Sequence, residues 1–165
     1  MEELLIRLEE ILKDETILYS QILNIGNKKT DIIVKGKVND LAVLIEQEQD
    51  IVSKLSKMEL ERDVITSAIH KELGLPDEKM TLTQLISHIK GSHATTLMEK
   101  QNTLLDTLGV VKSVNDQNGK LINNSLEYIE FSINVLSNAA NPGNNYNQVG
   151  YSDAAGKSSM FDLKL

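Results

Sequence analysis

The chain has 165 residues with 24 acidic and 17 basic side chains, no Cys, no Trp and only 4% aromatic residues. Because it lacks Cys, it has no disulfide framework, thiolate nucleophile or Cys-ligated zinc, and we expect it in the reducing cytoplasm. A net charge of -7 and few aromatic rings exclude the usual basic, stacking surface of nucleic-acid binders, so no nucleic-acid partner is expected.

Apolar residues recur in alternating steps of four and three through the first stretch, as Leu4, Leu8 and Ile11 illustrate. This spacing predicts a long helix over about residues 2–35, and the same rhythm predicts a second one over about 39–73. The apolar residues are Leu, Ile, Val and Met, which are typical of helices packed on helices. The sequence therefore predicts an all-α fold that begins with a long antiparallel helical hairpin.

Glycines mark the ends of both helices. Gly36 interrupts the first pattern, and Asn39 is placed to cap the helix that follows. Gly74 ends the second pattern, and Pro76 cannot continue it. We therefore expect a tight reversal near residues 36–39 and a connector after residue 74.

Charged residues interrupt the apolar stripe of each hairpin helix. With the turn centred near residue 37, Arg62 comes close to Glu15, and Glu48 comes within a turn of Lys29. These juxtapositions predict ion pairs that fix the register of the hairpin. The alternative is that Glu48 and Arg62 reach out to solvent along their apolar stems.

A short helix and a third long helix follow. Thr81 and Gln84 have the spacing of a capping box, which predicts a helix over about 81–90 that closes one end of the hairpin. The helical rhythm returns over about 94–140. We expect residues 1–140 to form one coiled-coil-like helical domain. Residues 141–165, rich in Gly, Asn and Ser, are expected to form a flexible tail.

Side chains with amide groups interrupt the apolar pattern of the third long helix between residues 115 and 124. Asn115, Asn118 and Ile122 lie on one helical face, so inward-facing amides could bond across the bundle. A solvated and locally frayed segment is the alternative, since Asn and Gly are poor residues for a helix interior.

No pattern of catalytic or metal-binding residues emerges from the sequence. His70, His88 and His93 are the only histidines, and none stands four residues from another. No metal or cofactor site is therefore expected, and the chain is not expected to be an enzyme. No apolar run approaches the roughly 20 residues that span a bilayer, so no direct membrane insertion is expected. Function through binding is the interpretation that remains.

Several short motifs occur in a characteristic order along the chain: Lys35-Gly36-Lys37, Leu41, Leu44, Glu48-Gln49, Leu55, Arg62, Thr81-Leu82-Thr83-Gln84-Leu85, Asn115, Asn118, Leu121-Ile122, Ser125-Leu126-Glu127-Tyr128-Ile129, and the tail from Tyr151-Ser152 to Phe161-Asp162. Their order resembles the FlgN-type flagellar export chaperones, and the likeness extends over nearly the whole chain.

The resemblance implies a cytoplasmic bacterial chaperone for the hook-filament junction proteins FlgK and FlgL. It also implies that the chaperone brings this cargo to FlhA, a subunit of the membrane export gate. Junction proteins end in amphipathic helices that assemble into coiled coils, and an unpaired apolar stripe aggregates unless another protein covers it. A chaperone of this kind needs a complementary stripe.

We expect that stripe at the far end of the third long helix, because the hairpin uses its own apolar faces internally. The predicted cargo-binding residues are Tyr128, Ile129, Ile133, Val135, Leu136 and Ala140. The alternative is that these are ordinary core residues packed on the hairpin. In the tail, Tyr146, Tyr151 and Phe161 are the predicted anchors for cargo or for the export machinery.

Two other functions compete with this hypothesis. A structural coiled coil would pair its exposed apolar seam with the seam of a second copy. A chaperone could form a homodimer as well. A helical-bundle enzyme with carboxylate-bound metal is the weaker alternative, since the chain lacks the Glu-x-x-His pairs of such sites.

Overall fold

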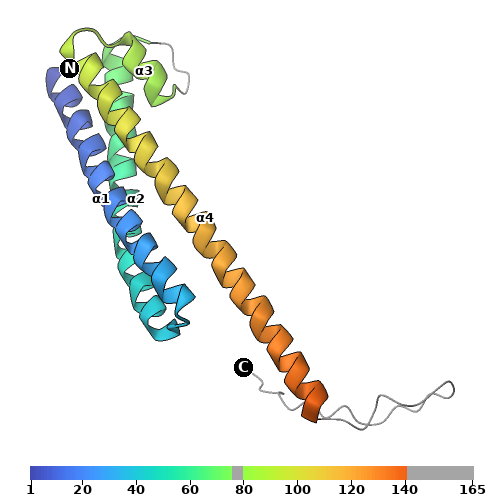
Figure 1. The fold of residues 1–165 in the computed structure, drawn as a ribbon. Helices are drawn as coiled ribbons and strands as arrows, with labels where there is room; N and C mark the ends of the chain where they lie inside the picture. The colour runs from blue at the N-terminus through green and yellow to red at the C-terminus, as the bar shows by residue number, and fades with distance from the viewer. Residues whose placement is uncertain (76–79, 141–165) are drawn as a thin grey trace, which may run out of the picture. The chain divides into compact units, whose positions relative to one another are not determined.

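The computed structural model describes residues 1–75 and 80–140, and these residues form four α-helices and no strand. The helices are α1 (Glu2–Val34), α2 (Val38–Glu72), α3 (Leu82–His88) and α4 (Ser92–Ala140), as Figure 1 shows. The predicted all-α class is confirmed, and each helix boundary lies within two residues of the expected one. The predicted tail lies outside the described residues.

The turn between α1 and α2 is closed by backbone hydrogen bonds around a glycine. Gly36 has a φ of +65°, and the Lys37 N–H donates to the Ile32 carbonyl at 3.1 Å. This is the helix end that favours Gly, since a side chain strains the left-handed conformation. The prediction that Asn39 caps α2 is wrong. The turn closes so early that α2 begins at Val38, and Asn39 lies inside its first turn.

Two ion pairs set the register of the antiparallel hairpin. Arg62 Nη1 lies 2.6 Å from Glu15 Oε2, and Lys29 Nζ lies 2.7 Å from Glu48 Oε2. Both predicted pairs are confirmed. The Arg62 and Glu48 side chains are only 24% and 23% exposed and each contacts its partner, so the alternative in which they reach out to solvent is wrong. Burial raises the pKa of the Glu15 carboxyl, and the Arg62 guanidinium offsets part of this rise.

The main core lies where α3 and the start of α4 cover the end of the hairpin. Its buried residues are Leu5, Leu8, Leu12, Ile69, Leu85, Ile86, Ile89, Leu97 and Leu104. α3 is held by the predicted capping box, in which Gln84 Oε1 accepts from the Thr81 N–H at 2.8 Å. The expectation that the short helix closes one end of the hairpin is confirmed.

A buried amide joins α4 to α1 further along the bundle. Asn118 is 3% exposed, and its Nδ2 donates to the Gly26 carbonyl at 2.8 Å. Its Oδ1 accepts from Thr30 Oγ1 at 2.6 Å. Gly26 permits this close approach, because a Cβ there would lie 3.0 Å from Val114 Cγ1. The inward-facing amide is confirmed for Asn118 but not for the exposed Asn115. α4 is helical through the whole segment, so the frayed alternative is wrong.

The chain divides into two compact units. Unit 1 comprises Met1–Leu126, and unit 2 comprises Glu127–Leu165. Within the described residues, no helix has the length and apolar character needed to cross a membrane. The candidate functional surface belongs to unit 2, and its described side chains are those of residues 127–137.

Candidate partner-binding surface

An apolar stripe is exposed on the unit 2 part of α4. Ile129, Ile133 and Leu136 follow one another in steps of four and three, so they share one side of the helix. Their exposed fractions are 52%, 48% and 68%. We call these three residues the first stripe. Their assignment to cargo binding stays a prediction.

A second apolar stripe runs along another side of the same helix segment. It consists of Tyr128, Phe131 and Val135, which are 72%, 65% and 49% exposed. Tyr128 and Val135 are among the predicted cargo-binding residues, whereas Phe131 was not predicted. The signal was available, because Phe131 lies three residues after Tyr128 and four before Val135.

Other predicted site residues cannot be placed. The side chain of Ala140 lies outside the described part of the chain, as do Tyr146, Tyr151 and Phe161. Their roles stay predictions. The structure thus brings five of the six predicted cargo-binding residues onto one exposed helix segment, divided between two stripes.

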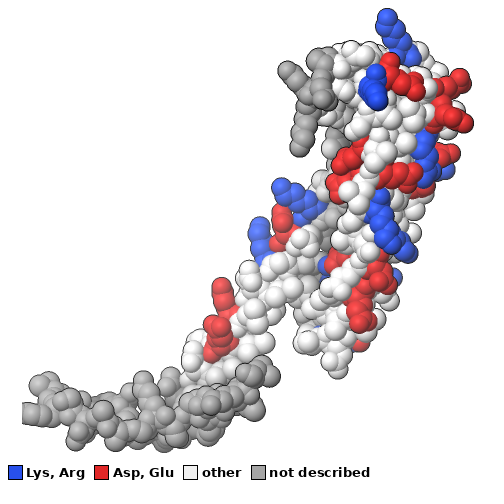
Figure 2. All heavy atoms as spheres, turned by 180° about the vertical axis from the view of Figure 1, so that it is seen from behind, with Lys and Arg blue, Asp and Glu red and all other residues white. Residues whose placement is uncertain are grey.

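The remaining side of this segment is polar and acidic. Glu127 and Glu130 are both exposed there, and no Lys or Arg occurs between residues 121 and 137. Unit 1 differs, since Figure 2 shows Lys and Arg side chains next to Asp and Glu side chains over its helices. Between residues 127 and 137 only Ser132 is half-buried, and every other residue is exposed.

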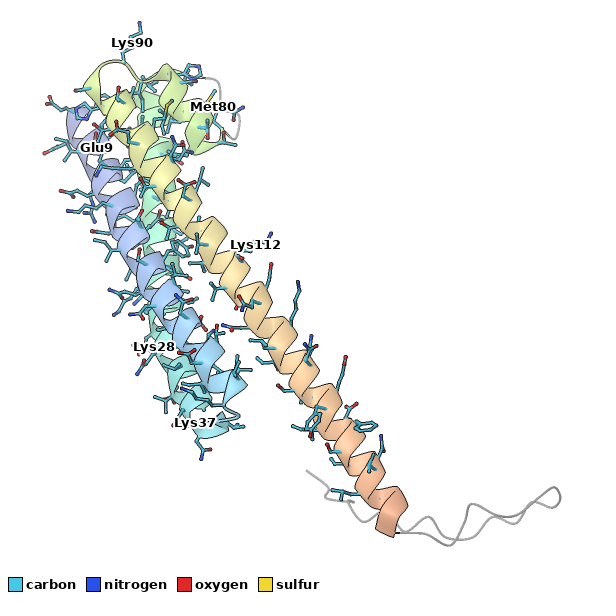
Figure 3. All side chains as sticks on the ribbon, viewed as in Figure 1. Glu9, Lys28, Lys37, Met80, Lys90 and Lys112 are labelled. Atoms are coloured by element: carbon cyan, nitrogen blue, oxygen red, sulfur yellow. The ribbon has the colours of Figure 1, made fainter. Side chains whose placement is uncertain are left out.

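Two pairs of polar side chains in unit 1 could support chemistry but are bound to each other, whereas the buried His70 Nε2 has no hydrogen-bond partner among the described residues. His93 Nδ1 lies 2.7 Å from Glu9 Oε1, where α1 passes the start of α4; Figure 3 labels Glu9. A cavity of about 330 Å³ borders Gly26, Val111 and the Lys29–Glu48 ion pair, whose charges already neutralise each other. Within residues 1–75 and 80–140, no group of three or more His, Asp or Glu could hold a metal ion.

Comparisons with known proteins identify the relatives of this chain. The model of the FlgN protein family matches residues 1–152. The chain is also 29% identical over 127 residues to the uncharacterized protein YvyG of Bacillus subtilis (strain 168), covering 77% of each protein. No solved structure matches the chain significantly.

Proposed function

The chain belongs to the FlgN family, the export chaperones of flagellum assembly, and we propose that it serves the hook-associated proteins FlgK and FlgL. In this proposal it binds both proteins in the cytoplasm, prevents their premature assembly and delivers them to the export gate subunit FlhA. The single observation that carries the proposal is the exposed first stripe on residues 127–137 of α4.

The first stripe has the properties that a cargo helix requires. A cargo that assembles through coiled coils exposes an apolar seam before assembly, and such a seam aggregates when it stays uncovered. Ile129, Ile133 and Leu136 offer matching side chains at the same helical spacing. Fully burying one such side chain is worth about 1.5–3 kcal/mol, and part of that gain is spent on ordering the partners.

The remaining predicted residues complete this proposal. Tyr128 and Val135 contact cargo beside the first stripe, and Ala140 extends it by one helical turn. Tyr146, Tyr151 and Phe161 anchor the tail to the cargo or to the gate. Binding through a short exposed segment leaves the core of unit 1 intact, so release at the gate requires no unfolding of that unit.

Substitution within the first stripe tests the proposal. The double variant Ile129→Asp, Ile133→Asp places two carboxylates where the cargo seam would lie, and it should lower the affinity for FlgK and FlgL at least tenfold in calorimetric titrations. Its helicity and thermal midpoint should stay those of the parent protein, since both side chains are exposed.

Leu105→Asp provides the matched control. Leu105 also lies on α4 and is 55% exposed, but it belongs to unit 1. This variant should bind cargo as the parent protein does. Unchanged affinity of the double variant, with unchanged helicity, would refute the assignment of the surface. A permanent dimer without affinity for either cargo would favour the self-associating coiled coil instead.

A further inference from the structure

The apolar surface of residues 127–137 is wider than one partner helix requires. At about 100° per residue, the first stripe (Ile129, Ile133, Leu136) and the second stripe (Tyr128, Phe131, Val135) together span about 200° of the helix circumference. A helix that packs against one neighbour typically has an apolar face about 100° wide. All six side chains are at least 48% exposed, so the segment presents two stripes to partners.

The charges around the stripes indicate what kind of partner fits. By helical phase, Glu130 borders the first stripe and Glu127 borders the second, each on its outer side. A second copy of this segment would bring two more carboxylates and no base, since residues 121–137 contain no Lys or Arg. A partner helix with a Lys or Arg beside its apolar seam complements each stripe instead.

A small side chain lies between the two stripes. By helical phase, Ser132 lies between Ile129 of the first stripe and Tyr128 of the second stripe. A Ser there leaves room for two bound helices to approach each other, which a larger residue would prevent. Two neighbouring helices, one on each stripe, therefore fit this segment better than a single one.

We propose that residues 127–137 bind two amphipathic helices of one cargo molecule side by side, one on each stripe, each carrying a Lys or Arg beside its seam. This inference rests on the proposed chaperone function. Its consequence is that one chaperone covers both apolar seams of a cargo whose terminal helices would otherwise pair prematurely.

The test compares two double variants against full-length FlgK in calorimetric titrations. Ile129→Ser, Ile133→Ser disrupts the first stripe, and Phe131→Ser, Val135→Ser disrupts the second. Each should weaken binding about tenfold while the stoichiometry stays one to one. The matched control is Val110→Ser on α4 in unit 1, because Val110 and Val135 are both 49% exposed. The control should change the affinity less than twofold.

FlgK trimmed of either terminal helix provides the second arm of the test. The trimmed cargo should become insensitive to one of the two double variants, because one stripe then has no occupant. If the second-stripe variant binds full-length cargo as the parent protein does, the two-helix arrangement is wrong while the proposed function stands. The two-helix arrangement would also be wrong if the second-stripe variant dissociated a dimer of this protein while its affinity for cargo stayed unchanged. If the parent protein itself binds no cargo, the proposed function is wrong.

Discussion

The two parts of α4 show how one helical pattern meets two environments. In unit 1, Leu97, Leu104 and Asn118 are at most 5% exposed, because the hairpin and α3 cover them. In unit 2, Ile129 and Ile133 continue the same spacing but are about half exposed. The apolar period thus specifies which side of the helix can be buried against another element. It does not specify whether that element belongs to the same chain.

The largest expected effect comes from truncating the same residue type in the two environments. Ile69 is fully buried in the main core, whereas Ile133 is 48% exposed. Ile69→Ala should lower the free energy of unfolding by about 2–5 kcal/mol, since it leaves a cavity in a packed core. Ile133→Ala should change it by less than about 0.5 kcal/mol.

Urea denaturation followed by circular dichroism measures both values in the absence of cargo. Ile133→Ala should weaken cargo binding even though it leaves stability nearly unchanged. If the two variants were equally destabilised, the contrast between buried and exposed parts of α4 would be lost, and Ile133 would be a core residue.

A smaller effect is expected from pH, and it concerns only unit 1. Burial raises the pKa of Glu15 above its ordinary value, despite the attraction of Arg62. The folded state therefore holds this proton more tightly than the unfolded state does. As the pH falls through the interval between the raised pKa and the ordinary value, protonation of Glu15 favours folding. Above that interval this contribution is absent.

Comparison with Glu15→Gln isolates the contribution, because Gln does not titrate. The unfolding free energy of the parent protein minus that of the variant should rise as the pH is lowered from neutral. Glu46→Gln, at an exposed position of α2, reports what the loss of a surface charge does. A difference that falls toward acidic pH would mean that the ion pair with Arg62 outweighs burial.

Sequence patterns predicted the scaffold well because its determinants are local or periodic. Glycines at turns, the Thr81–Gln84 spacing and the long apolar periods each have a direct conformational consequence. The pairing of Glu15 with Arg62 followed from an antiparallel hairpin once the turn was placed. The cap at Asn39 failed because the Gly36 turn is shorter than expected, a detail of backbone hydrogen bonding that residue types do not specify.

The surface was harder to predict because exposure depends on tertiary packing. Periodicity alone left Ile129 and Ile133 equally compatible with a core and with a binding face. Phe131 was overlooked although it shares one side of the helix with Tyr128 and Val135, which were predicted. The acceptor of Asn118 is a backbone carbonyl made accessible by Gly26, and no side-chain pattern indicates such a partner.

Amide hydrogen exchange with and without FlgK measures directly where cargo binds. The amides of residues 127–137 should exchange more slowly in the complex, while those of the buried residues Leu5, Leu8 and Leu12 keep their rates. Slower exchange confined to unit 1, with residues 127–137 unaffected by saturating FlgK, would contradict the account.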